Sequence, residues 1–278
     1  MIKLYQESRI VRPPFEAKSV YLQVTKGCTH NKCKFCTYYR DVDYRVSPDD
    51  EIIEDLKELK NRGYVFKRIW LLSADAFSLK TEQLLKIASY IHEYLPFVQS
   101  IGCYARITSL ENKTVHDLEK LKEKGYDKIV FGVESADDNI LKYSDKGYKS
   151  QDITKQLKKM DKARMKYTVI FLNGLAGHNY GLGHARKTAE LFNKLNPERI
   201  MINTLKIQEN SILDDEIEKR LFEESTEEEK LEELIEFIEK LEINTFIDAT
   251  NDTNKIKFFG KIQEKKKDMM EFLRKSKH

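Results

Sequence analysis

Short apolar runs alternate with segments of helical periodicity along this chain as far as residue 205. The runs have the length of buried strands, and they lie at 19–24, 68–73, 97–104, 127–133, 167–172 and 199–205. Between them, apolar residues recur every three or four positions, which indicates helices with one buried face. These helices are expected at 48–62, 81–95, 112–124, 150–166 and 184–195. Six strands that alternate with helices predict an α/β fold with a parallel sheet.

The pattern changes after residue 205. The sequence Ser-Thr-Glu-Glu-Glu at 225–229 resembles a helix capping box. It opens an expected helix at 226–241, whose apolar residues form one stripe and whose Glu and Lys residues are interpreted as its solvated face. A second amphipathic helix is expected at 261–277. Its basic run at 265–267 is interpreted as solvent-exposed, with a polyanion contact as the alternative.

These patterns predict one main domain with additions at both ends. Pro13 and Pro14 hold residues 1–18 out of a helix, so we expect an extended segment there. Residues 19–210 are expected to form the core, and residues 211–278 a helical extension that packs on it. Because sites in parallel α/β folds gather at the carboxyl ends of the strands, the loops that follow the strands are the candidate functional regions.

Composition narrows the class of protein. The 278 residues carry 49 Lys and Arg against 46 Asp and Glu, and the resulting net charge of +3 predicts no general affinity for nucleic acid. The first residues are polar, and no apolar run approaches the roughly 20 residues of a membrane span. Four cysteines, three of them grouped, are typical of metal ligands in a reducing cytoplasm. We therefore expect a cytoplasmic protein without a membrane segment.

The grouped cysteines follow the first expected strand directly. Cys28, Cys33 and Cys36 have the spacing C-x4-C-x2-C. Thiolates are the usual ligands of iron–sulfur clusters, and three of them would leave one iron of a 4Fe–4S cluster open for chemistry. A zinc site with His30 as fourth ligand and a redox pair of the last two cysteines are the alternatives. Cys103 lies in an apolar run and is expected to be a small buried residue.

The neighbours of these cysteines resemble the radical SAM superfamily, whose usual loop is C-x3-C-x2-C. The closer resemblance is to a small single-cluster subgroup related to elongator-like and coproporphyrinogen-dehydrogenase-like proteins. That subgroup carries R-P-P-x-E-A and then L-Q-x-T-x-G-C-x-H-N-x-C-x-F-C, which this chain matches at 12–17 and 22–36. The resemblance implies a partial (β/α)6 TIM-like barrel with a 4Fe–4S cluster on Cys28, Cys33 and Cys36 and S-adenosylmethionine on the open iron.

The resemblance also implies which residues bind S-adenosylmethionine. Asp75 stands where the subgroup has D-G-D-A and would pair with the ammonium, although it could instead cap a turn. Arg106, in Y-A-R, would bind the carboxylate as a bidentate guanidinium, with a structural ion pair as the alternative. Glu134, in G-x-E-S, would accept hydrogen bonds from the ribose or the ammonium.

The adenine side of the cofactor has its own candidates. Phe35 matches the aromatic residue that radical SAM loops place beside the adenine. Gly174 and Gly177 match a G-x-x-G after the fifth strand, where backbone would approach the adenine closely. His178 and His184 lie nearby, and surface or capping roles are expected for both.

The implied activity is radical chemistry. The protein would be an enzyme that cleaves S-adenosylmethionine reductively and uses the 5′-deoxyadenosyl radical to abstract hydrogen from an unidentified substrate. The implied partners are an electron donor such as flavodoxin or ferredoxin and a substrate, for which a small molecule is favoured over RNA. The substrate is expected to meet residues 206–278 as the wall of its site. An RNA-modifying radical SAM enzyme and a zinc-stabilised binding module without catalysis are the alternatives.

Overall fold

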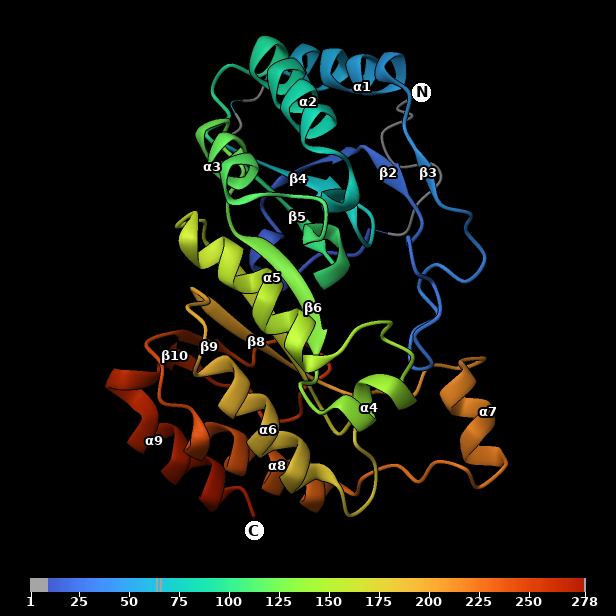
Figure 1. Ribbon diagram of the computed structural model, residues 1–278, viewed down its shortest axis with the longest axis vertical. Coiled ribbons are helices and arrows are strands. Elements are labelled where there is room, and N and C mark those ends of the chain that lie inside the picture. The colour runs from blue at the N-terminus through green and yellow to red at the C-terminus, as the bar shows by residue number, and fades with distance from the viewer. Residues whose placement is uncertain (1–9, 64, 66, 278) are drawn as a thin grey trace. The chain divides into compact units, whose positions relative to one another are not determined.

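The computed structural model describes residues 10–63, 65 and 67–277 (Figure 1). The chain forms two compact units. In described residues, the first unit comprises 10–31, 38–131 and 159–167, and the second comprises 32–37, 132–158 and 168–277. The boundary therefore passes through the cysteine loop, through two strands and through one helix, and each unit is described by itself.

The first unit is built on parallel strands. Its strand order is β1 (Val20–Gln23), β4 (Arg68–Leu72), β5 (Ser100–Ala105) and β6 (Ile129–Glu134), the last of which continues into the second unit. Leu22 pairs with Leu71, and Ala105 with Phe131. A separate antiparallel pair, β2 (Thr25–Lys26) and β3 (Arg45–Val46), follows β1.

Helices α1 (Asp49–Asn61), α2 (Thr81–Tyr94) and α3 (Val115–Glu123) accompany these strands, and neighbouring helices pack on each other in that order (Figure 1). In α1 the apolar positions Ile52, Leu56 and Leu59 are all buried, as their spacing predicts. Short 3-10 helices η1 (Pro14–Glu16), η2 (Ala76–Ser78) and η3 (Ile107–Leu110) complete the unit.

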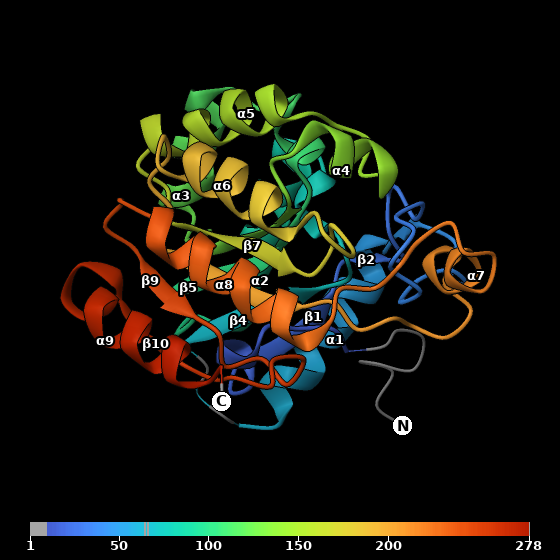
Figure 2. The ribbon, with the colours of Figure 1, turned by 90° about the horizontal axis from the view of Figure 1, so that it is seen from below.

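The second unit continues with four strands of its own. Their order is β7 (Tyr167–Asn173), β8 (Arg199–Thr204), β9 (Phe246–Asp248) and β10 (Phe259–Lys261), of which only β10 runs antiparallel to its neighbour. The helices are α4 (Asp138–Tyr143), α5 (Ser150–Lys162), α6 (Gly181–Phe192), α7 (Ile212–Glu218), α8 (Glu227–Lys240) and α9 (Ile262–Lys275). Helices α6 and α8 lie side by side (Figure 2).

The expected strand–helix alternation is confirmed, with boundaries that differ by a few residues. Each of the six expected strands is present, and α8 begins with the expected capping box, in which Thr226 and Glu229 bond to each other's backbone amides. Helix α1 begins one residue later than expected, because Pro48 holds its N-cap position, and α2 begins at Thr81 as expected, with Lys80 as N-cap.

Two expectations for the ends of the chain were wrong in part. Residues 211–277 are not only helical, because β9 and β10 add two strands beside β8. These strands have three residues each, so they carry little pattern of their own. Residues 14–16 form a short 3-10 helix, since the fixed φ of proline suits a first helical turn. Residues 1–9 of the expected extended segment lie outside the described residues.

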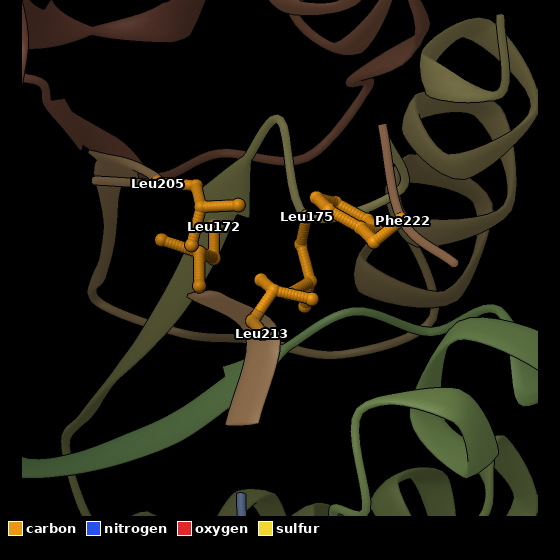
Figure 3. Close-up of a cluster of buried hydrophobic side chains, with 5 residues drawn as sticks. All are labelled: Leu172, Leu175, Leu205, Leu213 and Phe222. Atoms are coloured by element: carbon orange, nitrogen blue, oxygen red, sulfur yellow. The ribbon is translucent and has the colours of Figure 1, made fainter. Parts of the chain in front are cut away.

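A compact apolar cluster supports the carboxyl ends of β7 and β8 (Figure 3). It consists of Leu172, Leu175, Leu205, Leu213 and Phe222. Phe35 and Tyr143 pack against it from its partly buried edge. The cluster therefore joins one part of the cysteine loop to the strand ends and to α7.

Candidate active site

Gly27 shapes the turn that leads into the cysteines. Its φ of +77° is left-handed, and a Cβ there would lie 3.0 Å from the carbonyl oxygens of Val42 and Asp43. The Gly27 carbonyl accepts hydrogen bonds from the Ser73 hydroxyl and, at 3.4 Å, from the Ala74 amide. Because both donors follow β4, the turn is fixed against the carboxyl end of that strand.

The first part of the cysteine loop is held by side chains of the same unit. The Cys28 sulfur accepts a hydrogen bond from the Asn31 amide at 3.4 Å. The Asn31 side chain in turn donates to the Tyr39 carbonyl at 2.6 Å. Next to Cys28, the Thr29 hydroxyl donates to Oδ2 of Asp75 at 2.6 Å. Asp75 thus ties the segment around Cys28 to the end of β4.

The second part of the loop is a tight turn from Cys33 to Cys36, closed by a 3.1 Å hydrogen bond from the Cys36 amide to the Cys33 carbonyl. The Lys34 amide donates to the Ser144 carbonyl at 3.1 Å, and the Lys34 carbonyl accepts from the Leu213 amide at 3.0 Å. Backbone on both sides of this turn is therefore bonded to elements of the second unit, at the end of α4 and in α7.

The four cysteines fall into two groups by burial. Cys28, Cys33 and Cys36 are partly exposed, whereas Cys103 is fully buried and burial raises its pKa. Among the described residues, no three or more His, Cys, Asp or Glu side chains are gathered as metal ligands; Cys28 belongs to the first unit and the other two loop cysteines to the second. Three accessible thiols on one loop are nonetheless the donor set that suits an iron–sulfur cluster with one open iron.

Asp75 is buried and heavily bonded. Its carboxylate accepts from the Thr29 and Ser109 hydroxyls and, at 3.2 Å, from the Arg106 amide. Burial raises the pKa of Asp75, while these hydrogen bonds and the positive charge of Arg106 oppose the rise. It also lines a pocket of about 390 Å³ in the first unit, together with Thr29 and Lys113. The expected cap role is absent, because the Asp75 side chain makes no cap hydrogen bond to η2.

Arg106 directly follows β5 and holds the N-cap position of η3. Its backbone amide bonds to Asp75 and to the Ser109 hydroxyl, each at 3.2 Å. Its side chain is largely buried. The structure therefore brings Arg106 and Asp75, the two residues expected at the amino-acid end of the cofactor, to adjacent strand ends in the same unit.

Glu134 ends β6 in a conformation that is unusual for its residue type. Its φ of +68° lies in the left-handed region, which costs a non-glycine residue stability, and strained residues of this kind cluster at functional sites. The carboxylate lies 3.8 Å from the Lys146 ammonium, and its side chain is 12% exposed. Burial raises the pKa of Glu134, and the charge of Lys146 opposes the rise.

Lys146 connects Glu134 to Phe35. Its ammonium lies 5.8 Å from the centre of the Phe35 ring and 5.6 Å from that of Tyr148, and it donates to the Gly132 carbonyl at 2.8 Å. The glycine after it, Gly147, has a positive φ of +78°. The second unit thus gathers a carboxylate, an ammonium and an aromatic face, and the sequence analysis gave Lys146 no role in the site.

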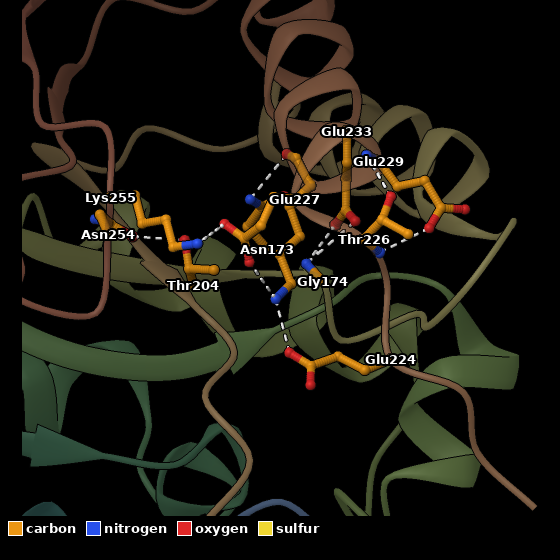
Figure 4. Close-up of polar contacts among 11 residues, drawn as sticks. Asn173, Gly174, Thr204, Glu224, Thr226, Glu227, Glu229, Glu233, Asn254 and Lys255 are labelled. Atoms are coloured by element: carbon orange, nitrogen blue, oxygen red, sulfur yellow. Dashed lines mark hydrogen bonds and ion pairs between the residues drawn. The ribbon is translucent and has the colours of Figure 1, made fainter. Parts of the chain in front are cut away.

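Gly174 and Gly177 are both left-handed, with φ of +84° and +77°. A Cβ on Gly174 would lie 3.3 Å from the Lys230 side chain, and one on Gly177 would lie 2.8 Å from the Phe222 ring. The Gly174 amide donates to the Glu233 carboxylate at 3.1 Å (Figure 4). Both glycines are therefore required by close packing of the chain on itself, whatever else they contact.

The expectation of a surface or capping role was wrong for His184. His184 and Glu233 are completely buried, and Nδ1 of the histidine lies 2.8 Å from Oε1 of the carboxylate. His184 also packs on Phe171. His178, in contrast, is partly exposed and pairs with Glu229 of α8 at 2.9 Å.

The solvated face expected for α8 was wrong at two positions, Lys230 and Glu233, which are both buried. Glu233 bonds to Gly174 and His184, as described above. A signal was present in the sequence: Lys230 and Glu233 stand four residues before Leu234 and Phe237, on the side of the helix that packs inward.

A pocket of about 490 Å³ opens in the second unit. It lies at the carboxyl ends of β7 and β8, beside the first turns of α8 and the loop at 252–256. The side chains that line it include Asn173, Thr204, Lys230, Leu231 and Asn254. The sequence analysis expected residues 206–278 to form a wall of the substrate site, but it assigned no individual residue of this pocket.

The comparisons with known proteins agree with this arrangement. A family model described as the radical SAM superfamily matches residues 22–192. No curated protein sequence matches the chain. Solved structures with a similar fold include TsrM, a radical S-adenosylmethionine methyltransferase from Kitasatospora setae with cobalamin and a [4Fe-4S] cluster, at 15% identity and a TM-score of 0.59. Methylornithine synthase (PylB) matches at 16% identity and a TM-score of 0.56. The Elp3 of the archaeon Methanocaldococcus infernus matches at 14% identity and a TM-score of 0.55.

These matches cover 73%, 80% and 82% of this chain, respectively, but only 37%, 63% and 59% of the solved chains. At such identities the likeness concerns the fold alone, and it supports the expected α/β partial barrel. In the described part of the chain, no helix is long and apolar enough to cross a bilayer.

Proposed function

Because the chain belongs to the radical SAM superfamily, an enzyme class that uses a 4Fe–4S cluster and S-adenosylmethionine, we propose that it uses the 5′-deoxyadenosyl radical to abstract hydrogen from a small-molecule substrate. One observation carries the proposal. Cys28, Cys33 and Cys36 are partly exposed and close together in sequence in the loop after β1, within the matched segment, whereas the fourth cysteine is fully buried.

The bound cluster supplies the electron that cleaves the sulfonium, and the protein supplies ligands, orientation and exclusion of water. Cys28, Cys33 and Cys36 are the proposed ligands. Their loop is held before the first ligand by Gly27 against the end of β4, and between the last two ligands by Lys34 against α4 and α7. Loss of either support would let the thiols move relative to one another.

Asp75 and Arg106 are proposed to hold the amino-acid end of S-adenosylmethionine. A carboxylate offers about four acceptor positions, and three of those on Asp75 are used by Thr29, Ser109 and the Arg106 amide. The remaining position is proposed for the ammonium of the cofactor. The Arg106 guanidinium is proposed for its carboxylate.

Glu134 and Phe35 are proposed to hold the nucleoside end. Glu134 is a mostly buried carboxylate whose backbone strain is maintained by its surroundings, which supports a binding role over a structural one. Lys146 lies between it and the Phe35 ring and orients both. Gly174 and Gly177 remain candidates for an adenine contact, although packing alone explains why both are glycine.

The partners are proposed from chemistry and charge. Reduction of the cluster requires an electron donor such as flavodoxin or ferredoxin. The net charge of +3 on 278 residues favours a small molecule over RNA as substrate, and its site is proposed to use residues 206–278 as a wall.

Anaerobic reconstitution tests the proposal. The protein should bind about four irons and release 5′-deoxyadenosine from S-adenosylmethionine when reduced. Cys33→Ala should abolish the cluster, and Cys103→Ala is the matched control that should retain it. Full iron loading of the Cys33→Ala protein, or stable zinc in place of iron in the parent, would exclude this function. Deuterium transfer from candidate substrates into 5′-deoxyadenosine would then identify the substrate.

A further inference from the structure

The 490 Å³ pocket of the second unit stands where parallel α/β folds bind ligands. Asn173 is the last residue of β7 and Thr204 the last of β8, so the pocket lies at the carboxyl ends of two adjacent parallel strands. Leu205 and Leu231 supply part of an apolar wall. Concave sites with apolar walls and a few convergent polar groups are typical of small-molecule binding.

Charges line this pocket in equal numbers. Three residues with ammonium groups and three with carboxylates line it: Lys206, Lys230, Lys255, Glu224, Glu227 and Asp252. Lys230 is largely buried and is bonded to Glu224 at 2.7 Å and to Glu227 at 3.1 Å. Glu227 also pairs with Lys255 at 2.9 Å.

These ion pairs differ in how easily they exchange partners. The side chains of Lys255 and Glu227 are 76% and 54% exposed, so water competes for them and they are held weakly. The Lys230 ammonium is held in place by burial. A ligand can therefore displace the exposed carboxylates from Lys230 and the exposed lysine from Glu227.

A buried acceptor in the pocket lacks a donor. Asn173 is 2% exposed, and its Nδ2 donates to the Lys230 carbonyl at 3.0 Å, which fixes the orientation of the amide. Among the described residues, Oδ1 of Asn173 has no hydrogen-bond partner. An unpaired buried acceptor destabilises the protein, so a ligand that donates an N–H there would be bound favourably.

We propose that this pocket binds a zwitterionic small molecule of the amino-acid type. The carboxylate of the ligand would pair with the ammonium groups of Lys230 and Lys255. The ammonium of the ligand would pair with the Glu227 carboxylate and donate a hydrogen bond to Oδ1 of Asn173. A ligand with one charge would leave one member of a displaced pair uncompensated, whereas a zwitterion compensates both. That this ligand is the substrate rests on the proposed radical function; its binding does not.

Three matched probes test the charge requirement on the reconstituted full-length protein without reductant. l-Leucine carries both charges, 4-methylpentanoate lacks the ammonium, and 3-methylbutylamine lacks the carboxylate. By calorimetry, leucine should bind with a dissociation constant in the millimolar range or lower. Each single-charge probe should bind at least about tenfold more weakly than leucine. Equal binding of 4-methylpentanoate, or no leucine binding, would overturn the proposal.

Variants test the location. Lys230→Met keeps the apolar stem and removes the charge, and Lys255→Gln changes only an exposed residue, so at least one should fold. Both variants should bind leucine about tenfold more weakly than the parent. Glu228→Gln, in the same helical turn but outside the pocket, should bind it as the parent does. Unchanged affinity in both lysine variants would place leucine elsewhere and contradict the proposal.

Competition separates this pocket from the cofactor site. Leucine should still bind when S-adenosylmethionine is saturating, and displacement would show that the pocket belongs to the cofactor site and so overturn the proposal. Because binding is measured without reduction, leucine binding without 5′-deoxyadenosine release would count against the proposed function alone. Release without leucine binding would count against this pocket alone.

Discussion

The Lys34 ammonium lies 2.5 Å from the Glu216 carboxylate. Lys34 stands between two expected cluster ligands, and Glu216 lies in α7, 182 residues further along the chain. Tyr143 strengthens the contact, since its hydroxyl donates to the other Glu216 oxygen at 2.5 Å and its ring lies 4.1 Å from the ammonium. The segment after the core therefore supports the cysteine loop in addition to lining a pocket.

Glu216→Gln should weaken this support. A charge-assisted hydrogen bond in a partly exposed pair contributes about 1 kcal/mol, so the protein should fold while the turn from Cys33 to Cys36 becomes more mobile. We expect faster loss of iron to a chelator from the reconstituted protein. Glu218→Gln, at the exposed end of α7, is the matched control and should lose iron at the parent rate. Equal rates for all three proteins would mean that α7 does not support the cluster.

Replacing Glu134 by glycine should raise the stability of the protein and lower its affinity for S-adenosylmethionine. A left-handed φ costs a non-glycine residue roughly 1–2 kcal/mol, so Glu134→Gly should raise the thermal midpoint. If the carboxylate contacts S-adenosylmethionine, the same change should weaken cofactor binding about tenfold or more, since such contacts contribute about 1.5–3 kcal/mol. Lys128→Gly, at another left-handed position (φ +55°), should gain stability without losing affinity. Unchanged affinity of the Glu134→Gly protein would remove this residue from the cofactor site.

Two glycines of the second unit should respond to alanine in opposite directions. Gly174→Ala forces a left-handed alanine against the Lys230 side chain and should destabilise the protein by about 1–2 kcal/mol. Gly183 lies inside α6, and a Cβ there meets nothing within 4 Å. Gly183→Ala should therefore stabilise by about 0.5–1 kcal/mol. Denaturant unfolding measures both, and a neutral Gly174→Ala would show that the β7 turn can relax.

The Glu229 carboxylate should make part of the stability depend on acid pH. Its pKa is lowered to about 2, chiefly by the hydrogen bond from the Thr226 amide and then by His178. A lowered carboxyl pKa stabilises the fold above the ordinary value of 4.5, and this contribution is lost as the pH falls from 4.5 towards 2. The difference in thermal midpoint between the parent and Glu229→Gln should be largest above pH 5 and shrink below pH 4.5. A difference independent of pH would contradict the assignment.

The contribution of His178 to stability should depend on pH in the opposite direction. Its pKa is raised, first by the hydrogen bond with Glu229. A raised histidine pKa stabilises the fold below the ordinary value of 6.5, and the contribution is lost as the pH rises through the folded value. The stability difference between the parent and His178→Gln should therefore decline above pH 6.5, whereas the Glu229→Gln difference loses only the histidine-dependent part there.

The sequence by itself determined the elements that rest on local pattern. Six strands and their helices follow from periodicity, because a buried face must recur with the geometry of its own element. The capping box of α8 lies within four residues and was equally readable. The cysteine loop was recognisable because its chemistry depends on residue type and spacing within nine positions, and the family comparison agrees with it.

Only the tertiary structure decided the contacts between distant parts of the chain. Glu233 resembles a surface residue of an amphipathic helix, and it is buried because His184 and Gly174, 49 and 59 residues earlier, provide partners. Strands β9 and β10 exist because β8 offers a sheet edge, since three residues cannot maintain a strand alone. Such states depend on the partner that the fold brings near, and no local pattern contains that partner.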